Sequence, residues 1–529
     1  MEWTPKFVAG WLFNPECGPR NGMIARWMLL RALGLIYFSA FFSLFFQIRG
    51  LIGPAGILPA GEYLQQVAEA TGAMRYWYAP TLLWISDSSF MLLGMCVAGM
   101  LAAVLLTLNL WPRGLLAMCF VCFLSFVSAA REFSGYQSDG MLLEAGFLAL
   151  FFAPGGLRPG LGEKNPPVRA SLLLLMWEWF RIYFESGVAK IVGGDPQWRN
   201  FTAMDEYYQN GPLPTWIGWY AEHLPHWFHA ATALGTLAVE LVLVWTTFLP
   251  RRFRIGLFIV LSALQAGIIL TANYTFLNYL VLALGILLLD DKFLARFALG
   301  SWRKPLERQD PGAKPASAEP GMGKFKALRI ALTTVMLGWI FYATVAEMLW
   351  MMRPGLPLLM SPVTALEPFR VANRYGLFAV MTRGRYEIEF QGSSDGKSWV
   401  AYPFRFKPQE LAKAPGIYAP YQPRFDWNLW FASLDTWREE PIVVQTERRL
   451  LLGNKDVLAL FAGNPFPGGP PKQVRAVLWQ YWFSTRAEKQ EKGLWWRRQL
   501  VGLYAPSLEL EEDGRIVVTA WPGTGGVLE

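Results

Sequence analysis

Hydrophobic residues gather in long, nearly uninterrupted segments through the first two thirds of the chain. They recur at about residues 27–47, 90–111, 115–130, 139–153, 170–192, 228–249, 255–272, 274–290 and 327–351. An α-helix rises about 1.5 Å per residue, so roughly 20 apolar residues span the hydrocarbon core of a bilayer. The pattern predicts a polytopic α-helical membrane bundle of about nine spans, of which 115–130 and 139–153 are short for a full crossing.

The pattern changes after residue 351, where short alternating stretches and turn residues replace the long apolar segments. Residues 386–390 and 399–406 alternate on either side of Asp395-Gly396, which predicts a β-hairpin. We also expect strands at 475–483 and 515–521, and helices at 427–437 and 448–462. This part of the chain is interpreted as a C-terminal α+β, β-sandwich-like soluble domain.

The predicted organisation therefore has two domains. Residues 1–351 form a transmembrane helical domain, and residues 352–529 form a β-rich domain. The stretch 291–326, rich in Pro, Gly, Ala and charged residues at its centre, is expected to be a cytoplasmic linker.

One apolar segment carries several charges. Residues 170–194 are long enough to cross a bilayer, about 35 Å as a helix, yet they include Glu178, Arg181, Glu185 and Lys190. The first three fall in one sector of the helix as i,i+3 and i,i+4 neighbours of opposite sign. Ionisable groups at membrane depth must face a protein interior or a wet cavity, so this helix is expected inside the bundle. The group is read either as a structural ion-pair network or as a ligand or proton site.

Charge distribution gives the orientation. The chain is 53% hydrophobic with a net charge of +8, a balance that fits basic cytoplasmic loops better than a nucleic-acid partner. With nine crossings and a cytoplasmic N-terminus, the outer loops hold only Arg49, Arg75, Arg131, Lys190 and Arg199. The inner side holds the larger basic set: Lys6, Arg20, Arg26, Arg113, Arg158, Lys164, Arg169, Arg251, Arg252, Arg254 and the basic stretch 292–326. The C-terminal domain is then expected on the periplasmic or lumenal side of a bacterial inner membrane or of the endoplasmic reticulum.

Two weaker patterns suggest chemistry. Cys119 and Cys122 lie on one face of an apolar segment, either as packing residues or as a pair that exchanges electrons with a quinone. The three histidines lie close together, with Glu222 and Glu240 as carboxylates that a metal would need, although interfacial histidines are the plainer interpretation. The histidines are His223, His226 and His229. No metal ligand or catalytic residue is assigned, and no phosphate-binding loop or hydrolase motif is found.

Asp139 and Glu144 stand near the outer end of the fourth apolar segment. They are five residues apart, so they share a helical face poorly, and helix capping by Ser138 or Asp139 competes with a functional acid. Two N-x-T sequences, at Asn200 and Asn273, are possible glycosylation sites in a secretory pathway, with chance occurrence as the simpler explanation.

Six stretches together resemble the lipase maturation factor family. They are the segments beginning QSDGMLLEAGF at 137, FESGVAKIVGGDPQWRNF at 184, LTANYTFLNYL at 270, NRYGLFAVMTRGRYEIEF at 373, APYQPRFDWNLWF at 419 and ALFAGNPFPGG at 459. They cover both predicted domains in the family's order, which makes the resemblance specific.

The resemblance implies a polytopic membrane protein that helps secreted lipases fold and assemble, with its conserved outer domain engaging the client. Membrane lipids and a secreted lipase or other exported protein are the implied partners, and no cofactor or catalytic residue is implied. Three groups of residues match the family's motifs. The intramembrane polar cluster is Asp139, Glu144, Glu178, Arg181 and Glu185; the outer-loop motif is Asp195, Trp198, Arg199 and Asn200; the client-binding group, chosen for expected exposure, is Asn373, Tyr375, Asp426, Trp427, Trp430, Asn464 and Phe466.

Two enzymatic alternatives remain open at this stage. The first is an intramembrane enzyme acting on a lipid or quinone through Glu178, Arg181 and Glu185. The second is a membrane thiol oxidoreductase that uses Cys119 and Cys122. Both predict loss of function in a folded, abundant variant, whereas a folding factor predicts effects through stability or client contact.

Overall fold

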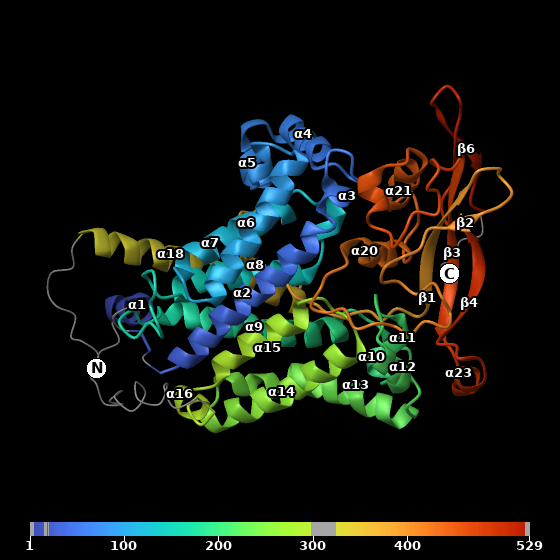
Figure 1. The fold of residues 1–529 in the computed structure, drawn as a ribbon. Helices are drawn as coiled ribbons and strands as arrows, with labels where there is room; N and C mark the ends of the chain where they lie inside the picture. Colours follow the sequence, from blue (N-terminus) through green and yellow to red (C-terminus); the bar gives the residue numbers. More distant parts are fainter. Residues whose placement is uncertain (1–4, 15–17, 20, 298–323, 524–529) are drawn as a thin grey trace.

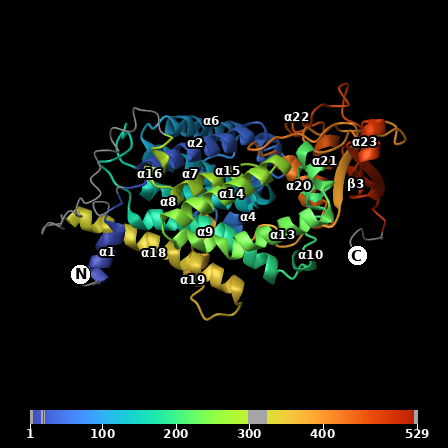
Figure 2. The ribbon, with the colours of Figure 1, turned by 90° about the horizontal axis from the view of Figure 1, so that it is seen from below.

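The computed structural model describes residues 5–14, 18–19, 21–297 and 324–523. Most of the linker expected at 291–326 lies outside these residues. Helices occupy one side of the molecule and a β-sheet the other, with a few helices between them (Figure 1). Figure 2 shows the same division from below.

The helical part contains one helix at each of the nine predicted segments. These helices are α2 (Met23–Phe45), α6 (Ser89–Thr107), α7 (Pro112–Val127), α8 (Gln137–Phe152), α9 (Arg169–Val192), α13 (His226–Leu241), α14 (Arg251–Thr271), α15 (Leu277–Gly285) and α18 (Lys324–Met352). Five segments in the described chain are long and apolar enough to cross a membrane: 23–45, 89–107, 226–248, 251–271 and 327–352. The helices at 112–127 and 277–288 are apolar but shorter. The described chain therefore supports five candidate spans, and the predicted nine crossings are not confirmed.

Shorter helices lie at the ends of these spans. They are α1 (Pro5–Phe13), α3 (Ile48–Ile52), α4 (Ala60–Thr71), α5 (Arg75–Tyr78), α10 (Pro196–Arg199), α11 (Tyr207–Asn210), α12 (Trp216–Glu222), α16 (Asp291–Leu294) and α19 (Ser361–Thr364). The helix α16 lies at the start of the segment expected to be a linker.

Close packing holds the bundle together. The helix α2 packs along α6, where a Cβ at Gly99 would lie 2.5 Å from the ring of Phe41. Only a glycine at position 99 lets that ring approach so closely. The helix α9 packs against α8, α13, α15 and α18. Glu178, Arg181, Glu185 and Lys190 of α9 are all buried, which confirms that this helix sits inside the bundle.

The C-terminal part is built on one sheet. Its strands are β1 (Arg385–Ser393), β2 (Val400–Ala401), β3 (Gln473–Phe483), β4 (Trp496–Leu503), β5 (Ser507–Leu510) and β6 (Ile516–Ala520). The strand order is β2-β1-β3-β5-β6, β4 pairs with β3, and all pairs are antiparallel. The expected hairpin is confirmed as β1 and β2.

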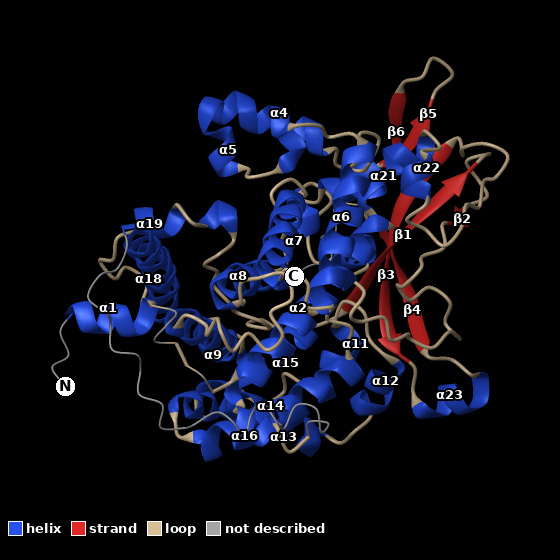
Figure 3. Cartoon of the chain, turned by 60° about the vertical axis from the view of Figure 1, so that its left-hand side comes forward, coloured by secondary structure: helices blue, strands red, loops and turns tan. Residues whose placement is uncertain are grey.

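Helices cover one face of this sheet (Figure 3). They are α20 (Arg424–Ala432), α21 (Pro441–Leu451) and α22 (Lys455–Leu458), while α23 (Arg486–Lys492) lies in the β3–β4 connection. Ile388, Phe390 and Leu478 join residues of α20 and α21 in the core. The described residues form no second sheet, so the arrangement is a two-layer α+β structure and not the expected sandwich. The single helix predicted at 448–462 is instead divided between α21 and α22.

One carboxyl group is buried in this core. Burial raises the pKa of Glu447 on α21 well above its ordinary value of 4.5, and the backbone N–H of Ala476 offsets this only in part. As the pH rises above the pKa that Glu447 has in the unfolded chain, the folded state keeps a proton that the unfolded state loses. This group therefore lowers the stability of the fold as the pH increases.

We therefore expect Glu447→Gln to stabilise the protein at pH 8 by about 1–3 kcal/mol, because the amide takes up no proton on folding and each unit of raised pKa costs about 1.4 kcal/mol at that pH. The gain should shrink towards pH 5, where the native carboxyl and its unfolded counterpart approach the same protonation state. Thermal unfolding of wild type and variant across this pH range measures the difference. Exposed Glu491→Gln serves as the control, and a gain independent of pH would contradict the assignment.

Candidate functional site

The polar residues of the bundle meet an extended segment that follows α18. We call residues 373–382 the strap. Its backbone runs beside the outer half of α9 and the loops that follow, and side chains of the bundle bind it at several points. These contacts join the membrane part of the chain to the sheet.

Arg181 on α9 is the centre of the first contact. It pairs with Glu144 of α8 and lies 3.7 Å from Glu185, and all three side chains are buried. Its guanidinium also donates to the carbonyl oxygen of Asn373 at 2.6 Å. Its Cζ atom lies 5.1 Å from the ring centroid of Tyr375.

The two carboxylates bind the strap directly. Glu144 Oε2 accepts from the backbone N–H of Asn373 at 3.0 Å and from the hydroxyl of Tyr375 at 2.9 Å. Glu185 Oε2 accepts from the backbone N–H of Tyr375 at 2.7 Å. The buried charges thus satisfy both one another and the polar backbone of the strap.

Glu178 does not form the ion pair with Arg181 that was expected along the helix. It is fully buried, yet within the described chain neither carboxylate oxygen has a hydrogen-bond partner and no ion pair with Arg181 forms. Glu144, from the neighbouring helix, takes the position beside Arg181 instead. The i,i+3 pair predicted from α9 alone is therefore wrong.

Further along α9, Lys190 secures the middle of the strap. Its Nζ atom lies 2.9 Å from Glu240 of α13 and donates to the carbonyl oxygen of Leu377 at 2.9 Å. Ser186 accepts from the backbone N–H of Leu377 at 3.2 Å. Glu240, one of the two carboxylates considered for a metal, therefore forms an ion pair with Lys190.

Two residues of the outer-loop motif hold the end of the strap. Asp195 caps α10 and accepts from the backbone N–H of Met381 at 2.7 Å. The indole of Trp198 donates to the carbonyl oxygen of Phe378 at 2.9 Å. Arg199 and Asn200 are exposed, and Arg199 donates to the carbonyl oxygen of Ile191 at 3.4 Å.

A second connection is made by Arg424 at the start of α20. Its guanidinium binds Asp139 of α8 through two hydrogen bonds of 2.7 and 2.8 Å, and both side chains are fully buried. It also donates to the carbonyl oxygen of Phe133 at 2.6 Å. Gln47 of the bundle adds a 2.9 Å bond to the carbonyl oxygen of Gln422.

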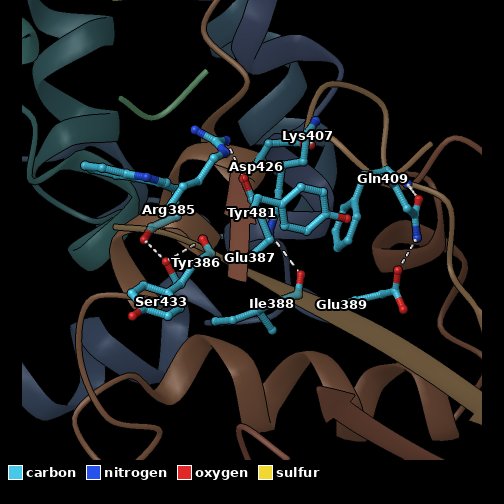
Figure 4. Close-up of polar contacts among 12 residues, drawn as sticks. Arg385, Tyr386, Glu387, Ile388, Glu389, Lys407, Gln409, Asp426, Ser433 and Tyr481 are labelled. Carbon is cyan, nitrogen blue, oxygen red and sulfur yellow. Dashed lines mark hydrogen bonds and ion pairs between the residues drawn. The ribbon is translucent and has the colours of Figure 1, made fainter. Parts of the chain in front are cut away.

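A third polar group lies inside the C-terminal part (Figure 4). Glu387 of β1 pairs with Arg385 and with Lys407, the latter at 2.9 Å. Arg385 continues to the bundle's outer loop, where it donates to the carbonyl oxygen of Gln209 at 3.0 Å. Burial raises the pKa of Asp426 to about 6, and the Lys407 ammonium offsets part of that shift.

The residues chosen for client contact are mostly buried. Tyr375, Asp426, Trp427 and Trp430 are each under 10% exposed, so the expectation that they face solvent is wrong. They pack inward because the strap and α20 lie against the bundle. Asn464 is exposed and forms a turn with the partly buried Phe466. Asn373 is half-buried at the strap. Their role in client binding is untested.

The histidines are bound to protein groups. His226 and His229 each place Nδ1 near a carboxylate oxygen of Asp205, at 3.0 and 3.2 Å, and His223 lies 2.7 Å from the carbonyl oxygen of Trp219. Burial, with neighbouring Glu206, raises the pKa of Glu222 to about 9, which keeps that carboxyl neutral. In the described chain no group of residues fits a metal ion.

The remaining candidates are also part of the packing. Cys119 and Cys122 are buried, unpaired thiols of α7. Asn273 is buried, and its amide binds the backbone of both the bundle and the C-terminal part, including a 2.9 Å bond to the carbonyl oxygen of Gly416. Its side chain is therefore closed to glycosylation.

Sequence reasoning found most of these residues but did not bring them together. Arg424 and Lys407 were missed, since both lie in ordinary-looking polar stretches. The weak signal for Arg424 was its place in the motif beginning at 419. Among the contacts described above, none joins a nucleophile to an adjacent base; the buried ion pairs hold one part of the described chain on another.

Comparison with protein families matches both parts. The family model described as the lipase maturation factor transmembrane domain matches residues 24–296, and that of the lipase maturation factor C-terminal domain matches residues 371–506. The second match includes the strap.

Individual relatives are similar over nearly the whole chain. Lipase maturation factor 1 of Mus musculus is 31% identical over 525 residues, covering 94% of this chain and 90% of its own. Lipase maturation factor 2 of Homo sapiens is 32% identical over 596 residues, covering 92% and 83% respectively. No solved structure matches.

Proposed function

The chain belongs to the lipase maturation factor family, and we propose that it is a membrane-anchored folding and assembly factor for an exported client, with a secreted lipase as the first candidate. The observation that carries this proposal is that buried charged side chains of the bundle bind the C-terminal part of the chain and hold it in place. Arg181 of the bundle donates to the carbonyl oxygen of Asn373 in the strap, and Arg424 of the C-terminal part binds Asp139 of the bundle. A catalytic acid or base needs access to a substrate, and these groups are closed by protein.

We place the C-terminal part, residues 352–529, on the periplasmic or lumenal side, in a bacterial inner membrane or the endoplasmic reticulum. The excess of basic residues in the alternate loops supports this orientation. It would put the sheet where an exported polypeptide emerges.

The client-contact face that we favour is the face of the sheet turned away from α20 and α21. The strand register places Arg475, Trp479 and Leu500 on that face. Arg475 stacks on Trp399 and Arg498 stacks on Trp479, each with 4.0 Å from the guanidinium carbon to the ring centroid. Leu500 is 51% exposed. Arg475, Trp399, Trp479 and Arg498 are partly exposed. Aromatic and guanidinium groups are enriched where proteins bind one another.

The test uses the double variant Leu500→Asp/Trp399→Ala in the full-length protein. We expect client recovered with the purified factor, and secreted client activity, to fall about tenfold, because central aromatic and apolar contacts carry much of binding energy. The abundance and melting temperature of the factor should be unchanged.

Trp227→Ala is the matched control, since Trp227 is 70% exposed and lies on α13 of the bundle, which is not part of the sheet. It should leave the client's recovery and activity intact. Normal client maturation by the double variant would exclude this face, and no client recovered with wild type would exclude the function.

A further inference from the structure

A cavity of about 530 Å³ opens where the bundle meets the beginning of the strap. Its lining comes from the α7–α8 connection, from α18 and from the chain between α19 and Tyr375, with Tyr63 of α4 and Tyr78 of α5 at its side. Figure 3 shows α5, α8 and α19 around this region. The volume is in the range of small-molecule sites.

The cavity lies at the end of several apolar helices. The last residue of α7, Val127, and the first of α8, Gln137, line it, and so does Glu347, close to the end of α18. Tyr76 and Trp77 of α5 are exposed beside the lining residue Tyr78. Tyr and Trp collect where lipid headgroups meet water, so the cavity is at headgroup depth.

Charges of both signs face this space. Arg370, Arg374, Glu347 and Glu367 line the cavity, and in the described part of the chain none of these four forms an ion pair within 4.0 Å. By contrast, the lining residue Arg131 is 3.3 Å from Glu132. Arg374 attracts Glu347, and Arg370 attracts the buried Asp139, but neither arginine is held in a short ion pair in the described chain. Two cations and two anions therefore border the space that a ligand would fill.

The backbone is strained at the same place. Arg131 and Arg370 have φ values of 49° and 53°, a left-handed conformation that is uncommon for side chains of this size. The side-chain amide of Asn373 stabilises the conformation of Arg370 by donating to its carbonyl oxygen at 3.0 Å. Residues held in such conformations cluster at active sites and ligand sites.

We propose that this cavity binds the headgroup of a membrane phospholipid that carries both a phosphate and an ammonium, as phosphatidylethanolamine does. Arg370 and Arg374 bind the phosphate, because guanidinium groups donate two parallel hydrogen bonds to phosphate oxygens. Glu347 and Glu367 bind the ammonium, and the tyrosine rings attract the same cation. The acyl chains extend from the cavity into the bilayer.

The experiment titrates the delipidated full-length protein in detergent with short-chain lipids and counts bound molecules by native mass spectrometry. The probes are dihexanoyl phosphatidylethanolamine, dihexanoyl phosphatidylglycerol, O-phosphoethanolamine and inorganic phosphate. We expect phosphatidylethanolamine to bind at least tenfold more tightly than each of the others.

Three variants assign the groups. Arg370→Gln/Arg374→Gln should weaken phosphatidylethanolamine binding more than tenfold, and Glu347→Gln should remove the preference over phosphatidylglycerol. Arg252→Gln, at a basic site on α14 outside the cavity, should bind as wild type does. Unchanged melting temperatures show that the variants remain folded.

Several outcomes would overturn the proposal. Equal affinity for inorganic phosphate would indicate a site for soluble anions. Equal binding by wild type and the double arginine variant would place the lipid elsewhere. Displacement of the lipid by a client polypeptide, with that displacement lost in the double arginine variant, would assign the cavity to the client.

Discussion

Arg424→Ala is expected to lower the free energy of unfolding by about 3–5 kcal/mol. The substitution leaves the carboxylate of Asp139 fully buried without its two charged hydrogen bonds, and an uncompensated buried charge carries a cost of this size. It also removes the donor to the carbonyl oxygen of Phe133. Chemical unfolding of the purified protein in detergent measures the loss.

Two further variants serve as controls for Arg424→Ala. Arg405→Ala removes an exposed arginine that donates one 3.1 Å bond to a backbone carbonyl, and it should lower stability by about 1 kcal/mol or less. Asp139→Leu/Arg424→Met replaces both charges with apolar groups and should recover much of the loss, because no charge is left buried. A loss below about 1 kcal/mol in Arg424→Ala would contradict the role assigned to this pair.

Arg181→Met should have a comparable effect, about 3–5 kcal/mol, and should also release the strap. It leaves Glu144 and Glu185 buried together without a cation and removes the donor to the carbonyl oxygen of Asn373. We expect the strap to become a site of limited proteolysis, since a freed extended segment is readily cleaved.

Mass spectrometry of the fragments measures that change. Arg199→Met is the control, because Arg199 is exposed and, within the described chain, its one side-chain hydrogen bond is the 3.4 Å bond to the carbonyl oxygen of Ile191. If Arg181→Met were less stable but its strap still resisted the protease, the contacts other than Arg181 would be sufficient to hold the strap, and this prediction would be wrong.

The sequence predicted the helices well because their apolar segments are long. It could not predict which charges would pair between helices. Periodicity reports which residues share a face of one helix, and so it placed Glu178 beside Arg181. The actual partner, Glu144, is 37 residues from Arg181, and Asp139 is 285 residues from Arg424. Such pairs depend on packing that no local pattern encodes.

The C-terminal part shows the same limit. Aromatic residues of α20 were expected to be exposed, yet Trp427 packs against Tyr136 of the bundle, with 5.5 Å between ring centroids. The strands β4 and β5 were not predicted. β4 lacks a clear alternation and carries a register shift against β3, and β5 has only four residues. The sandwich interpretation failed because helices, not a second sheet, cover the core face.

The measurement that tests the central claim most directly is secreted client activity per molecule of folded factor in Glu178→Gln. Glu178 is the buried carboxyl most open to a chemical interpretation, because no hydrogen bond or ion pair in the described chain involves its oxygens. If the bundle's charges only support the junction, this ratio should equal that of wild type, whatever happens to abundance. An abundant, folded Glu178→Gln protein that no longer matures its client would contradict the account and indicate chemistry within the membrane.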